Sequence, residues 1–105
     1  MKRFHHFGVP TTTPREGETY LPGARLYVTD PGSSPNAIEW LRFEPDCPMP
    51  ETLRTRAHIA FEVDNLDAAL VGQTILIEPF EPMDGVRVAF IMEDEQAVEL
   101  MQITA

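Results

Sequence analysis

The sequence has few of the residues that cross-link a protein or anchor it in a membrane. Cys47 is the only cysteine, which excludes an internal disulfide and a zinc site built from several thiolates. No apolar run approaches the roughly 18 residues of a membrane-spanning helix. The first ten residues, MKRFHHFGVP, lack the apolar segment of a secretory signal. We therefore expect a cytoplasmic protein in a reducing compartment.

Positive charge is also scarce. Lys2 is the only lysine, and the formal net charge is −9. Phosphate backbones and anionic membrane surfaces would repel such a protein on average, so we expect neither a nucleic-acid partner nor a membrane partner. A few arginines could still form one local basic patch for an anionic ligand; they are Arg15, Arg25, Arg42, Arg54, Arg56 and Arg87.

The sequence does contain enough apolar material for one core. Its 105 residues, 43% of them hydrophobic, predict a single globular domain over 1–105. This composition is not that of an intrinsically disordered protein. Cys47 lies in the proline-rich stretch PDCPMP. Nothing in the sequence places a base beside this thiol, so we expect no catalytic role for it.

Two stretches far apart in the chain share one residue pattern. AIEWLRF (37–43) and AVELMQI (97–103) both run alanine, branched aliphatic residue, glutamate, two bulky apolar residues, long polar residue and apolar residue. Upstream of each lies a matching histidine segment, HFGV (6–9) in the first half and HIAFEV (58–63) in the second. We interpret the chain as two copies of one module.

The modules span about 1–50 and 54–105, and the second is the fuller copy. Its patterns predict a strand, a short helix and three more strands, at 57–63, 65–71, 74–78, 86–92 and 97–103. The helix has Asp64 or Asn65 as its N-cap and Gly72 as its stop. Asp84-Gly85 marks a hairpin turn.

The first module is truncated. It keeps strands near 4–9, 25–29 and 37–43, whereas prolines and glycines make 10–23 a loop with at most a stub of helix or strand near Glu18–Leu21. The fold class is therefore α+β. Two modules side by side can form one sheet with a shared concave interior. The truncation leaves apolar edges, so we expect a homodimer.

The repeat places a histidine and a glutamate at equivalent points twice: His6, Glu39, His58 and Glu99. A lone strand histidine is usually a surface or capping residue, and a lone strand glutamate usually faces water. Their equivalence in a duplicated pattern favours a divalent first-row metal site with positions left for water or substrate. His6 aligns with His58, whereas His5 points to the opposite face.

These segments resemble the vicinal oxygen chelate superfamily, which includes glyoxalase I, methylmalonyl-CoA epimerase, bleomycin and fosfomycin resistance proteins, and extradiol dioxygenases. The motifs that carry the resemblance are HHFGVP, IEWLRF, HIAFEVDNLDAAL and VRVAFIMEDEQAVELMQ. The resemblance implies paired βαβββ modules in an open eight-stranded barrel-like sheet around a metal held by those histidines and glutamates. The sequence departs from the family in its truncated first module and in EDEQA, where the family often has DPDGN.

Three functions follow as hypotheses. The first is a glyoxalase-type lyase or isomerase that stabilises an enediolate on a small oxygenated substrate, with Glu99 and Glu39 as catalytic carboxylates and Zn, Ni, Mn, Co or Fe as the divalent ion. The second is an Fe(II) ring-cleaving dioxygenase using His6, His58 and Glu99. The third is a non-catalytic protein that binds a small molecule or drug.

Other residues of this predicted site are less well defined. Candidate pocket walls lie two residues along the same strands, at Leu41, Met101, Ala60 and Gly8. Arg25 or Arg87 could bind a carboxylate or phosphate of the substrate, although an ordinary surface position explains either arginine equally well.

Overall fold

A computed structural model describes residues 1–104 of the protein, and these residues contain eight strands and short helices. The strands are β1 (Lys2–Pro10), β2 (Thr19–Leu21), β3 (Leu26–Val28), β4 (Ile38–Phe43), β5 (His58–Val63), β6 (Thr74–Met83), β7 (Val86–Glu93) and β8 (Gln96–Ile103). The helices are η1 (Pro31–Ser33, a 3-10 turn), α1 (Glu51–Thr55) and α2 (Leu66–Leu70).

The expected α+β class with an open eight-stranded sheet is confirmed for the described residues. Their hydrogen-bonded strand order is β2-β3-β4-β1-β5-β8-β7-β6, and the sheet mixes parallel and antiparallel pairs. No helix within residues 1–104 is both long enough and apolar enough to cross a membrane. The chain divides into two compact units. The N-terminal unit comprises 6–57, and the C-terminal unit comprises 1–5 together with 58–104.

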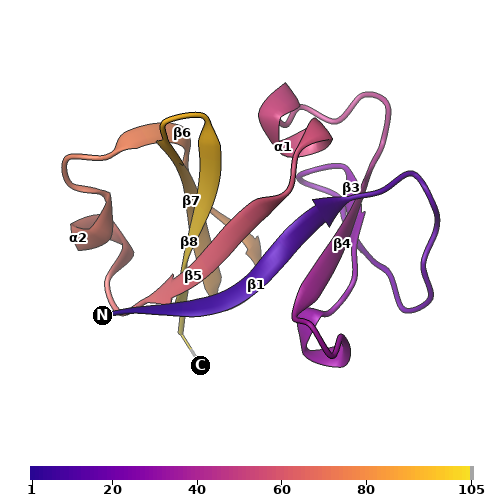
Figure 1. The fold of residues 1–105 in the computed structure, drawn as a ribbon, viewed down its shortest axis with the longest axis horizontal. Helices are drawn as coiled ribbons and strands as arrows, with labels where there is room; N and C mark the ends of the chain where they lie inside the picture. Colours follow the sequence, from indigo (N-terminus) through magenta and orange to yellow (C-terminus); the bar gives the residue numbers. More distant parts are fainter. Residues whose placement is uncertain (105) are drawn as a thin grey trace. The chain divides into compact units, whose positions relative to one another are not determined.

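The C-terminal unit is built on a parallel pair of strands. β5 runs parallel to β8, and β7 pairs antiparallel with both β8 and β6. α2 packs against one face of these strands (Figure 1), where the buried apolar core consists of Val63, Leu66, Ala89, Ile91, Val98 and Leu100. Strand alternation therefore directs His58 and Glu99 to the other face of the same strands.

α2 begins where the sequence predicts. The Asn65 side chain accepts a hydrogen bond from the Ala68 amide at 3.1 Å, and the Gln102 side chain accepts one from the Leu66 amide at 2.7 Å. Two of the amides that a helix start leaves without helical partners are thereby satisfied. The N-cap is Asn65 rather than Asp64, which instead binds Arg3 at 3.0 Å.

The N-terminal unit repeats the parallel pair in a reduced form. β1 runs parallel to β4, which pairs antiparallel with β3, and β3 pairs antiparallel with β2. One face carries the buried cluster Ala24, Leu26, Val28 and Leu41. On the opposite face, Arg15 stacks 3.7 Å above the Trp40 ring and Arg42 lies 4.1 Å from the Tyr27 ring.

The register of the parallel pair is the same in both units. Gly8 lies opposite Glu39 in β1 and β4, and Ala60 lies opposite Glu99 in β5 and β8. Each of these small residues follows its histidine by two positions. The duplication found in the sequence is therefore present in the strand pairing as well.

The expected stub of the first module is confirmed, and the elements depart from expectation at two other places. The stub expected near Glu18–Leu21 is the short strand β2, at Thr19–Leu21. The segment between β4 and β5, for which the sequence patterns predict no helix, contains α1, which buries Leu53. β6 continues to Met83, well beyond the predicted end at 78, although it includes Pro79 and Pro82. Register shifts along the β6–β7 pair accommodate this longer strand.

Candidate functional site

The N-terminal unit brings His6 and Glu39 together. Glu39 lies opposite Gly8, so its carboxylate reaches the imidazole two residues earlier on the same face of the sheet. The His6 Nε2 atom is 3.3 Å from Glu39 Oε1, and the two side chains are 1% and 19% exposed. β4 enters this register after Ala37, whose left-handed φ of 56° turns the chain and whose carbonyl accepts a hydrogen bond from the Phe7 amide.

The C-terminal unit brings His58 and Glu99 together in the same way. The His58 Nε2 atom is 3.0 Å from Glu99 Oε1, and the two side chains are 2% and 10% exposed. The Phe90 ring packs edge-on against the imidazole, with ring centroids 5.2 Å apart. A carboxylate in such apolar surroundings is costly unless a cation or hydrogen-bond donor compensates it, and the imidazole is one such compensating group.

Each pair therefore offers one nitrogen and one oxygen ligand from a buried position. Two ligand atoms bound about 2.0–2.2 Å from one ion lie about 3 Å apart at a right angle and about 3.4 Å apart at a tetrahedral angle. The observed separations of 3.0 and 3.3 Å fall within this range. An imidazolium–carboxylate hydrogen bond has a similar length, so it is the burial and duplication of the pairs that favour a metal.

His5 differs from its neighbour His6. The His6 side chain is buried, whereas that of His5 is half-buried, as expected for successive residues of one strand. The predicted wall residues Leu41, Ala60 and Met101 are buried, as is Gly8.

The arginines considered from the sequence mostly have acidic or aromatic partners. Arg25 binds Asp46 at 2.7 Å and Arg87 binds Asp67 at 3.0 Å, both at exposed positions. These contacts favour the surface interpretation of the two arginines. Arg42 binds Glu18 at 2.6 Å. The Arg42 guanidinium holds the pKa of Glu18 below its ordinary value of 4.5, against the opposing effect of burial.

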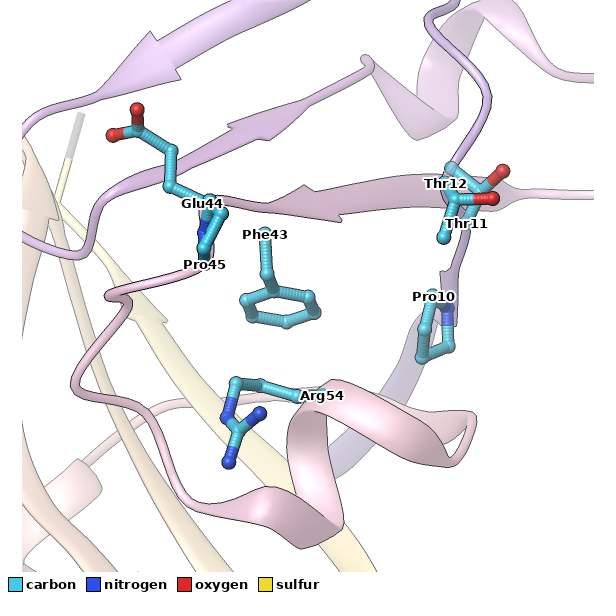
Figure 2. A pocket seen from close by; sticks show the side chains of 7 residues that line it. All are labelled: Pro10, Thr11, Thr12, Phe43, Glu44, Pro45 and Arg54. Atoms are coloured by element: carbon cyan, nitrogen blue, oxygen red, sulfur yellow. The ribbon is translucent and has the colours of Figure 1, made fainter.

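The N-terminal unit also holds a pocket of about 510 Å³ that the sequence did not reveal (Figure 2). Its lining residues come from the end of β1, the end of β4 and α1: Pro10, Thr11, Thr12, Phe43, Glu44, Pro45 and Arg54. Sequence patterns locate strands and helices, whereas this pocket forms where three of them end. The one available signal was Arg54, a candidate for anion binding whose location the sequence left open.

Comparisons with known proteins support the fold but assign the chain to no family. No protein-family model matches the chain, and no curated protein matches it. Among solved structures, the chain is similar to a hypothetical protein, BH1468, from Bacillus halodurans C-125. That similarity has a TM-score of 0.70 and 16% sequence identity, and it covers 99% of this chain and 96% of that chain. At this identity the likeness concerns the fold alone.

Proposed function

We propose that the protein is a divalent-metal enzyme of the lyase or isomerase class, in which His6, Glu39, His58 and Glu99 together hold one ion. These four side chains form one group of residues that could ligate a metal. The observation that carries the proposal is the duplicated pair: an imidazole nitrogen within 3.3 Å of a carboxylate oxygen, in the same strand register, in each unit.

The donor set is chemically suited to such an ion. Two neutral imidazoles and two carboxylates match the ligand preferences of Zn, Ni, Mn, Co and Fe. The carboxylates would balance the charge of a divalent cation, which removes much of the cost of burying them. When bound, the ion would supply Lewis-acid stabilisation of negative charge on a substrate oxygen.

The two carboxylates are the candidates for proton transfer. A base that removes a proton from the carbon next to that oxygen must reach the substrate, and the Glu39 side chain is the more exposed of the two, at 19% against 10% for Glu99. Glu99 lies opposite Phe90 in the β7–β8 pair, and its side chain is the less exposed of the two. We propose that one of these two carboxylates acts as the base and the other as its counterpart across the ion.

The second carboxylate favours this class over a dioxygenase. A non-haem Fe(II) oxygenase uses two histidines and one carboxylate, which leaves several coordination positions for oxygen and substrate. Glu39 would take one of those positions, and it stands beside its histidine just as Glu99 does. A purely sequestering protein would require neither buried carboxylate.

Metal analysis of the purified protein tests the proposal. After growth with Ni, Zn, Mn, Co and Fe, the wild-type chain is expected to carry one ion, measured by inductively coupled plasma mass spectrometry. His6→Gln and His58→Gln are expected to lose it, because each removes one nitrogen ligand. His5→Gln is the matched control and is expected to retain the ion.

Activity is tested separately with the hemithioacetal of methylglyoxal and glutathione. Conversion by the metal-loaded protein, absent after chelation, is the expected result. Absence of any bound metal in the wild type would overturn the proposal. Oxygen consumption by an iron-loaded protein would replace the proposed class with a dioxygenase.

A further inference from the structure

The pocket of the N-terminal unit combines an apolar floor with a polar wall. The Phe43 ring occupies its centre in the close-up, with Pro45 and Pro10 on either side (Figure 2). Thr11 and Thr12 line it from the segment after β1, with their hydroxyl oxygens directed away from the Phe43 ring in the close-up, and Arg54 lines it from α1 (Figure 2). Apolar walls with a few oriented polar groups are typical of small-molecule sites.

Arg54 is the cation of this pocket, and it is held in place. Its Nε donates a hydrogen bond to the Met49 carbonyl at 2.9 Å, which fixes the side chain through a neutral acceptor. Arg3, Arg25, Arg42 and Arg87 each lie against a carboxylate, whereas no ion pair within residues 1–104 involves Arg54. Its two terminal nitrogens can therefore donate to an external anion in the forked geometry that suits a carboxylate.

The acidic residue of the lining, Glu44, has partners outside the pocket. The Glu44 carboxylate accepts a hydrogen bond from the Tyr20 hydroxyl and lies 4.0 Å from Arg25. This hydrogen bond raises the pKa of Tyr20, so the phenol remains a donor. In the close-up the Glu44 carboxylate points away from the Phe43 ring (Figure 2). Glu44 is therefore directed toward Tyr20 and Arg25, whereas Arg54 is in no ion pair within residues 1–104.

The Thr11 side chain is oriented by a local hydrogen bond. The Thr11 Oγ1 atom accepts a hydrogen bond from the Thr13 amide at 3.1 Å, which orients the hydroxyl and leaves its hydrogen able to donate. The fixed Arg54 guanidinium can recognise the oxygens of a carboxylate, while the Phe43 and proline surfaces accept an apolar body.

We propose that this pocket binds a small carboxylate that carries an apolar or aromatic body, with the carboxylate held by Arg54 and the body packed on Phe43. The pocket shares a sheet face with the His6–Glu39 pair, because Pro10 follows His6 by four residues and Phe43 follows Glu39 by four. Four residues of strand span about 13 Å. The pocket would then recognise the distal carboxylate of an extended substrate of the metal site. This link to the metal site rests on the proposed function.

The test measures binding of 4-phenylbutyrate to the full chain after metal removal, by calorimetry and by two-dimensional NMR. Saturable binding is expected, with shifts at Thr11, Thr12 and Phe43. The corresponding amide and amine are expected to bind far more weakly, because they cannot accept the guanidinium donors. Arg54→Gln is expected to weaken binding about tenfold, because the variant loses one charge-assisted hydrogen bond to the carboxylate. Arg56→Gln is the matched control and should bind like wild type.

Three results would overturn the inference: no saturable binding, equal affinity for the amide, or unchanged affinity in Arg54→Gln that is folded by circular dichroism. Thr11→Val provides a second variant, for which a smaller loss of affinity is expected. Because metal-free protein is used, failure here leaves the metal content of the wild type untouched. Conversely, normal carboxylate binding by a protein that never holds metal would remove the proposed function and keep the pocket.

Discussion

At the scale of single residues, Glu99 is the least expected feature of the molecule. It lies in an otherwise apolar strand, its side chain is 10% exposed, and its carboxylate lies 3.0 Å from the His58 imidazole. A carboxylate so placed needs a positive partner, either a protonated imidazole or a bound ion. Glu39 lies beside His6 in the same way, so the pairing of a buried histidine with a glutamate occurs once in each unit.

Glu99→Gln tests the chemical role of this carboxylate. The amide keeps the shape of the side chain but can neither accept a proton nor carry the charge that favours a cation. On the hemithioacetal substrate we expect turnover to fall by about 10²–10⁴-fold, the usual contribution of a positioned acid or base. Full activity in this variant would remove Glu99 from the mechanism. Glu95→Gln, at an exposed position in the turn between β7 and β8, is the control.

The Arg42–Glu18 pair makes a testable contribution to acid stability. The hydrogen bond from Arg42 lowers the pKa of Glu18 in the folded protein below its ordinary value of 4.5. The stabilisation is therefore fully present above pH 4.5 and is lost as the pH falls through the lower folded pKa. The difference in unfolding free energy between wild type and Arg42→Gln should shrink toward pH 3, while NMR titration should show the Glu18 pKa rising in the variant. A pH-independent difference would contradict this account.

At the scale of elements, much of the architecture follows from local patterns. The alternation in 97–103 predicts β8, and the cap and stop residues predict α2, because both depend on neighbouring residues alone. The elements that were missed depend on tertiary contacts. α1 is a single short helix that buries Leu53, and β6 extends past two prolines because it pairs with β7 along the whole hairpin.

The candidate site shows the same division. The duplicated histidines and glutamates could be identified from sequence because they recur at equivalent points of a repeat. The 3.0 and 3.3 Å separations within the pairs depend on the parallel register, which only the folded chain displays. The Arg54 pocket was missed because its residues come from three unrelated segments.

Substitution of Gly85 tests how tightly the turn between β6 and β7 is packed. Its φ is +79°, and a Cβ atom at this position would meet the Thr104 carbonyl oxygen at 2.8 Å. Gly72 has the same φ of +79° with no atom within 4 Å of such a Cβ. Gly72→Ala should therefore cost about 1–2 kcal/mol from backbone strain alone, and Gly85→Ala should cost more in chemical denaturation. Equal losses would show that the contact with Thr104 relaxes without penalty.

At the scale of the whole molecule, metal binding should be coupled to folding, because unfolding separates ligands that are far apart in sequence. Free ion at one hundred times its dissociation constant is expected to raise the free energy of unfolding by about 2.7 kcal/mol. Calorimetric scans with and without a chelator measure this increase. It should persist in His5→Gln and disappear in His6→Gln. An equal increase in both variants would place the ion elsewhere.

The most direct test of the central claim is an anomalous-scattering map from a crystal grown with the metal that the protein retains. Our account predicts one peak per chain, bonded to the imidazoles of His6 and His58 and to the carboxylates of Glu39 and Glu99. A peak bound to other residues, separate peaks at the two pairs, or no peak would contradict it.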